Sequence, residues 1–232
     1  MNDDRSPAHA HSLKRHLDRL KELRGTGKST PPRLAELKSW QAQRLARTYA
    51  DVASQPRYRA ATAFFLDDLY GPKDFSGRDQ AMLRILPVMS RVLPQTAVET
   101  AALAIELEAV SESLDHALAA ALPAGPIDAA SYGQAYRESS TRAEREHQID
   151  LFDAVGHRLD ALVKKPFVPG TLKLMRRPAK VAGLGDLQDF LERGFAAFRG
   201  MKGADEFLAL LRSRETAILN ALFSGKPEPF SL

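Results

Sequence analysis

Acidic and histidine side chains occur at spacings that suit a metal site inside a helical bundle. Glu144 and His147 form a Glu-x-x-His pair, which occurs once in the chain. Ferritin-like proteins use this motif twice to place two ligands on one helix face. Glu99 and Glu106 are seven residues apart and therefore stack on one line of a helix, while Glu215 interrupts an apolar stripe. These five residues are the candidate metal ligands.

Simpler explanations exist for the same residues. Thr141 and Glu144 fit a capping box, and an arginine such as Arg84 or Arg214 would pair with the other carboxylates. His147 or His116 could also serve as a haem ligand, but the chain has no Cys-x-x-Cys-His attachment motif. We therefore expect no bound cofactor. A metal- or haem-dependent oxidoreductase that uses His147 and nearby glutamates is the alternative function.

Other catalytic signals are weak. The chain has no cysteine, which excludes a thiolate nucleophile and a disulfide framework, and it has no Gly-x-Ser-x-Gly turn. GTGKST at residues 25–30 lacks the first glycine of a phosphate-binding loop, because Glu22 stands in its place. No catalytic residue is predicted, and whether the chain is an enzyme stays open.

Residues 164–185 have six basic residues, three prolines and three glycines, and the basic residues lie within the segment 164–180. Its basic residues alternate with apolar ones, and no acidic residue follows before Asp186. It is the predicted anion- or partner-binding site, acting as a lid, a clasp or a docking surface. The alternative is pairing with the protein's own acidic helices, with Glu108, Glu112 and Asp115 among the possible partners. The predicted binding residues are Lys164, Lys165, Lys173, Arg176, Arg177 and Lys180.

Charge is unevenly distributed along the chain. Residues 1–60, 61–160 and 161–232 carry net charges of +7, −8 and +5. This pattern favours self-association or an anionic protein partner. Nucleic acid is disfavoured, because Phe167 is the one aromatic residue placed among the basic ones. Contact with an anionic membrane surface stays open. The predicted function is therefore that of a binding protein.

Helical periodicity dominates the chain, since alanine and leucine fill the periodic segments while isoleucine and valine are few. Residues 64–70 are apolar on most sides, as in a buried helix. Further helices are predicted over 31–54, 77–93, 95–122, 141–163, 186–199 and 204–223. We predict an all-α multi-helix bundle of about nine or ten helices around this buried central helix. A basic N-terminal helix and linker (1–30) and a frayed tail (225–232) flank the bundle domain (31–224).

Two stretches carry a family resemblance. FFLDDLYGPKDFSGRD and LERGFAAFRGMKGADEF resemble an uncharacterised family of bacterial all-helical proteins marked by Phe-Phe-Leu, Leu-Tyr-Gly-Pro and Asp-Phe-Ser. The resemblance runs from about Trp40 onward and implies the fold class, with no activity attached. The N-terminus has no apolar run of the signal-peptide type, and no stretch reaches the ~18 apolar residues of a membrane span. A cytoplasmic location is expected.

Overall fold

The structure is a computed structural model and describes residues 6–24, 30–69 and 95–231. These residues form ten α-helices, one π-helical turn and no strand, which confirms the predicted all-α fold. The helices are α1 (Ser6–Arg24), α2 (Leu34–Thr48), α3 (Ala50–Ser54), α4 (Arg59–Phe64), α6 (Gln95–Ala121), α7 (Ala129–Ser139), α8 (Arg142–Val163), α9 (Val168–Val181), α10 (Gly185–Gly200) and α11 (Asp205–Phe223), with the π-helical turn at Phe65–Leu69. The helix predicted over 77–93 lies outside the described residues.

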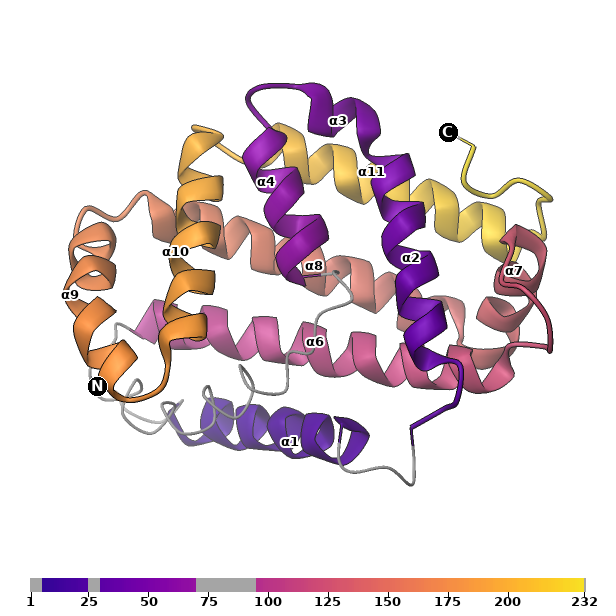
Figure 1. The fold of residues 1–232 in the computed structure, drawn as a ribbon, viewed down its shortest axis with the longest axis horizontal. Helices are drawn as coiled ribbons and strands as arrows, with labels where there is room; N and C mark the ends of the chain where they lie inside the picture. Colours follow the sequence, from indigo (N-terminus) through magenta and orange to yellow (C-terminus); the bar gives the residue numbers. More distant parts are fainter. Residues whose placement is uncertain (1–5, 25–29, 70–94, 232) are drawn as a thin grey trace.

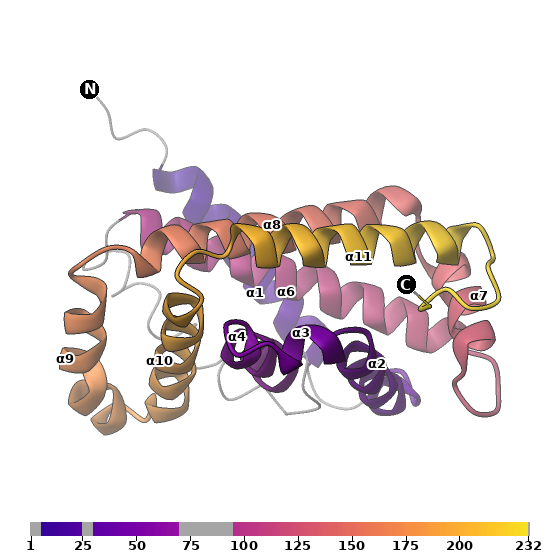
Figure 2. The same ribbon diagram turned by 90° about the horizontal axis from the view of Figure 1, so that it is seen from above.

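The helices are arranged in two directions. The helices α1, α6, α8 and α11 run along the long axis of the molecule, and α2, α4 and α10 cross them on one face (Figure 1). The view from above places α2, α3, α4 and α10 on the same side of α8 and α11, with α9 at one end and α7 at the other (Figure 2). The core lies between these two groups of helices.

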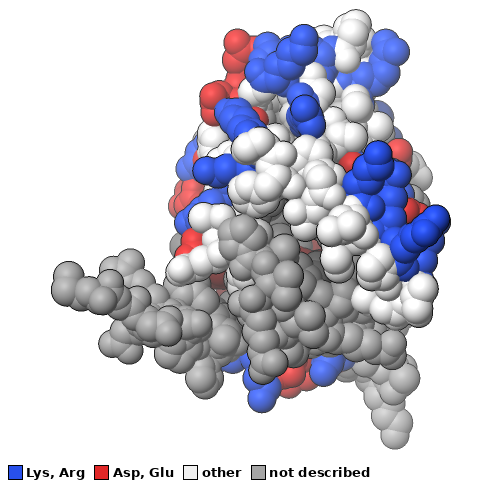
Figure 3. Space-filling model, turned by 90° about the vertical axis from the view of Figure 1, so that its left-hand side faces the viewer, with Lys and Arg blue, Asp and Glu red and all other residues white. Residues whose placement is uncertain are grey.

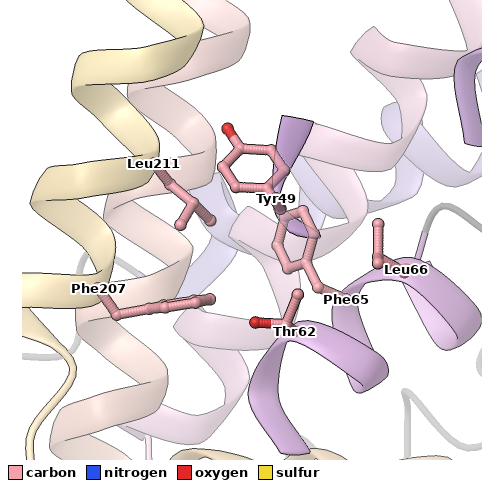
Figure 4. Close-up of a pocket in the computed structure, with 6 residues that line it drawn as sticks. All are labelled: Tyr49, Thr62, Phe65, Leu66, Phe207 and Leu211. Carbon is pink, nitrogen blue, oxygen red and sulfur yellow. The ribbon is translucent and has the colours of Figure 1, made fainter. Parts of the chain in front are cut away.

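The segment predicted to be central is buried. Phe64 and Phe65, at the junction of α4 and the π-helical turn, are 7% and 9% exposed. The ring of Phe65 meets that of Phe152 on α8 at 4.6 Å, and a Cβ on Gly194 of α10 would lie only 2.7 Å from Phe64 Cζ. A glycine therefore lets α10 approach the central helix closely. Beside Phe65, side chains from α4, the π-helical turn and α11, together with Tyr49, leave a cavity of only about 10 Å³ (Figure 4).

Capping boxes set the starts of α7 and α8. Thr141 and Glu144 form the predicted capping box at the start of α8, with the Thr141 backbone N–H donating to Glu144 Oε2 at 2.7 Å. Asp128 and Ser131 form another at the start of α7. The helix predicted over 31–54 is instead divided into α2 and α3 at Tyr49, whose φ and ψ of −111° and 17° are not helical.

The two ends of the chain also pack on the bundle. On α1, Leu17 and Leu20 pack against Ile105 and Ala109 of α6. At the other end Phe230 lies against Trp40, with ring centroids 5.7 Å apart. The segment 225–232 was predicted as a frayed tail. In the structure, Phe230 of this segment packs against the hydrophobic cluster that includes residues of α2 and α7.

Candidate functional site

Most of the basic segment forms the helix α9, which begins at Val168 and contains Pro178. Pro169 occupies the first turn of α9, where its missing N–H has no helical partner to lose. Ala179 is buried with Leu184 and Leu187, and Gln188 Nε2 donates to the Leu172 carbonyl at 2.7 Å. These contacts hold α9 against α10.

The outer face of α9 is apolar. Phe167, Leu174 and Val181 are spaced seven residues apart and so fall on one line of the helix. They are 49%, 78% and 91% exposed. Met175 lies beside this line and Leu191 belongs to α10, and both are exposed as well. These five are all the large apolar side chains that are exposed in the part of the chain the structure describes. In other proteins, exposed apolar side chains grouped in this way are typical of interaction sites.

Basic side chains border this apolar line. At 100° per residue, Lys173, Arg177 and Lys180 fall together along one edge of it. None of them forms an ion pair with a described residue, and neither does Lys165. Figure 3 shows lysine and arginine side chains bordering a band of uncharged ones at this end of the molecule. We call Phe167, Leu174, Val181, Lys173, Arg177 and Lys180 the α9 surface.

Two of the predicted binding residues are engaged in ion pairs. Lys164 Nζ lies 2.5 Å from Asp160 Oδ2 on α8. Arg176 donates to Glu192 on α10 at 2.6 Å, and this hydrogen bond, with one from Gln188, lowers the pKa of Glu192 to about 2. The predicted set therefore separates into two groups. Lys164 pairs within the end of α8 and Arg176 joins α9 to α10, whereas Lys165, Lys173, Arg177 and Lys180 are exposed and form no such ion pair with a described residue.

The alternative of internal pairing holds for Lys164 and Arg176, whose partners are Asp160 and Glu192. The acidic residues of α6 have other partners. Arg24 donates to Glu108 and Glu112, each at 2.9 Å, and Lys38 Nζ lies 2.8 Å from Glu112. Burial alone would raise the pKa of Glu112, but the two cations lower it overall. Asp115 accepts a hydrogen bond from Gln41 at 2.9 Å. The basic N-terminal third thus neutralises the acidic middle of the chain.

The structure distributes the five candidate metal ligands over separate contacts. Glu144 caps α8, and Arg158 donates to Glu99 at 2.9 Å. His147 is exposed, and its Nε2 lies 3.8 Å from Glu106. Glu215 accepts from Arg44 and not from the predicted Arg214. Within the described ranges no group of three or more histidine and acidic side chains could hold a metal ion.

The second haem candidate also has a local contact. His116 is buried, and its Nε2 lies 3.4 Å from Glu112 Oε1. Burial lowers the pKa of His116, although the nearby Glu112 acts in the opposite direction. The imidazole of His116 therefore lies beside Glu112, the carboxylate that also pairs with Arg24 and Lys38.

Sequence reasoning missed part of the α9 surface. The alternation of basic and apolar residues, Phe167 among them, predicts part of it, whereas Val181 and Leu191 were not predicted. The signal for the apolar line is the seven-residue spacing of Phe167, Leu174 and Val181. The prolines and glycines around it are typical of a loop, which is why the sequence did not indicate a helix here.

These features define the class of the protein as an all-α multi-helix bundle with an exposed apolar and basic helix at one end. Residues 21–229 match the family model of a domain of unknown function (DUF8198), and the chain belongs to this family. No curated protein and no solved structure matches the chain. None of the helices in the described ranges is both long and apolar enough to span a bilayer.

Proposed function

We propose that this protein is a binding protein that docks an acidic protein partner on the α9 surface. One observation carries the proposal: the exposed large apolar side chains of the described residues gather on α9 and α10, beside basic side chains that pair with none of those residues. When a complementary partner covers this surface, its apolar side chains would be removed from water and its basic side chains would form ion pairs.

A helical segment of the partner suits the shape of this surface. An apolar line repeated every seven residues is the seam on which a second helix packs. Phe167 to Val181 spans roughly 21 Å at 1.5 Å per residue, which corresponds to about four turns. The basic residues lie along one edge, so acidic residues along one edge of the partner helix would fix its orientation.

Charge reversal on the α9 surface is expected to abolish capture of the partner. The variant Lys173→Glu, Arg177→Glu, Lys180→Glu replaces attraction by repulsion, and we expect at least a tenfold loss of partner recovered on the immobilised protein from its native cell extract. The matched control is Lys14→Glu, Arg15→Glu, Lys21→Glu, which makes the same charge change on exposed residues of α1. The control should retain capture, and salt should weaken it in both the wild type and the control.

Three results would count against this proposal. Equal capture by the α9 variant would show that the charges are not used, and equal loss in the control would show a non-specific charge effect. Sedimentation of the purified protein as a dimer that the α9 variant dissociates would assign the surface to a second copy. Flotation with anionic vesicles in preference to binding protein would assign it to a membrane.

A further inference from the structure

A second, larger cavity lies inside the bundle, away from the α9 surface. Its volume is about 100 Å³, and its walls come from α2, α6, α7, α8 and α11. A single water needs roughly 10–15 Å³, and a cavity of about 150 Å³ holds benzene. A molecule of a few heavy atoms therefore fits. The cavity shares Tyr49, Phe65 and Leu211 with the small apolar one in Figure 4.

Arg145 supplies a buried positive charge to the wall of this cavity. The residue is 3% exposed and forms no ion pair with a described residue. Its Nε donates to Ser140 Oγ at 3.0 Å, and its guanidinium carbon lies 4.1 Å from the centre of the Tyr136 ring. Its Nη2 has no hydrogen-bond partner. Because a buried charge without a counterion is costly, this nitrogen is suited to an anion.

A second arginine contributes another free donor. Arg44 is 8% exposed, and its Nη1 donates to Glu215 at 2.9 Å while its Nε has no partner. Asp115 also lines the cavity, and burial raises the pKa of its carboxyl group, although a hydrogen bond from Gln41 and the charges of Lys38 and Arg145 act in the opposite direction. The unpartnered arginine nitrogens are therefore the donors of the wall that lack an acceptor.

The remaining walls favour an organic anion over an inorganic one. Leu45, Ile149 and Phe152 line the cavity. Tyr132 and Tyr136 also line it, and the centroids of their rings are 5.8 Å apart. Such walls would accept a short hydrocarbon group, which an inorganic oxyanion lacks.

We propose that this cavity binds a small organic carboxylate of about two to four carbon atoms, a size set by the cavity volume. One carboxylate oxygen accepts a hydrogen bond from the guanidinium of Arg145, Arg44 lines the same cavity, and the hydrocarbon part packs against Ile149 and Phe152. The site is independent of the α9 surface, so the charge-reversed α9 variant should keep it unchanged.

Butyrate is the probe for this site, and butyramide is its neutral analogue of nearly the same shape. Calorimetric titration of the full chain should show one saturable butyrate site, with butyramide binding at least tenfold more weakly and phosphate not binding. The single tryptophan, Trp40, stacks on Tyr132 at 4.6 Å. Because Tyr132 lines the cavity, the fluorescence of Trp40 should change along the same binding curve.

Variants at two arginines of the same cavity test the assignment. Arg145→Met should weaken butyrate binding at least tenfold. Arg212 also lines the cavity, but it already pairs with Asp150 at 2.5 Å and with Asp153 at 3.3 Å. Arg212→Met should therefore change the affinity by less than twofold.

The proposal is overturned if butyrate shows no saturable binding, if butyramide binds equally well, or if Trp40 fluorescence does not follow the titration. It is also overturned if folded Arg145→Met protein binds butyrate as the wild type does. Should Arg145→Met fail to fold, the comparison of butyrate with butyramide on wild-type protein still decides between a charge-selective site and an unselective one.

Discussion

Glu215→Ala is expected to lower the free energy of unfolding by about 2–4 kcal/mol. Glu215 accepts hydrogen bonds from Arg44 Nη1 at 2.9 Å and from the Tyr49 hydroxyl at 2.8 Å. Arg44 is 8% exposed and Tyr49 is 3% exposed, so removal of the carboxylate takes the counterion from a buried charge and one acceptor from a buried hydroxyl. The side chain of Glu215 is 28% exposed, which keeps the expected loss below that of a fully enclosed pair. Chemical denaturation measures it.

Glu206 on the same helix provides the matched control. It too accepts from an arginine and a tyrosine, Arg57 at 2.6 Å and Tyr58 at 2.8 Å, but its side chain is 72% exposed. Exposed ion pairs contribute about 0–1 kcal/mol, and we expect Glu206→Ala to fall in that range. Equal losses at the two positions would contradict the view that burial of Arg44 makes Glu215 important.

Gly156→Ala is expected to destabilise the protein by about 1–3 kcal/mol, against the usual helix preference for alanine. A Cβ at Gly156 on α8 would lie 2.4 Å from Leu208 Cδ2 and 3.0 Å from Cδ1 on α11. Leu208 is 1% exposed, so it has little room to move. The new methyl group would therefore push α8 and α11 apart. The midpoint of denaturation with urea should fall accordingly.

Two further variants test this explanation. Gly170→Ala on α9 places a methyl group where no atom lies within 4 Å, and it should raise stability by up to about 1 kcal/mol. In a Leu208→Ala background, Gly156→Ala should lose most of its cost, because the clashing side chain is gone. If Gly156→Ala destabilises the Leu208→Ala protein as much as the wild type, contact with Leu208 is not the cause of its effect.

Much of the fold followed from local patterns. The Thr141 and Glu144 capping box fixed the start of α8, and the apolar periodicity after Gln95 gave the extent of α6. The buried position of Phe64 and Phe65 followed from apolar residues on most sides of a short helix. These features depend on residues close in sequence, which is why the sequence was sufficient to predict them.

Long-range pairings could not be predicted in the same way. The Glu215 partner is 171 positions away at Arg44, and no spacing rule connects the two. The same holds for Arg24 with Glu112, 88 positions apart, a contact that replaces the expected pairing of α6 with the basic segment. Oppositely charged residues were abundant, so the sequence allowed several pairings and only packing of the helices selected one.

The α9 surface was predictable in part. The excess of basic residues at 164–180 was evident from the sequence, and the division into paired Lys164 and Arg176 and outward-facing Lys173, Arg177 and Lys180 required the structure. The cavity around Arg145 was not predicted, because its wall combines residues from α2, α6, α7, α8 and α11.

Photo-crosslinking from position 174 tests the central claim most directly. Leu174 is 78% exposed in the middle of the α9 surface, so a photoreactive amino acid placed there should fit without disturbing the bundle. In cells, irradiation should join it to an acidic protein, and the same group at the exposed position 217 on α11 should give no such product. Equal products from both positions, or none from position 174, would contradict the assignment of the α9 surface as the docking site.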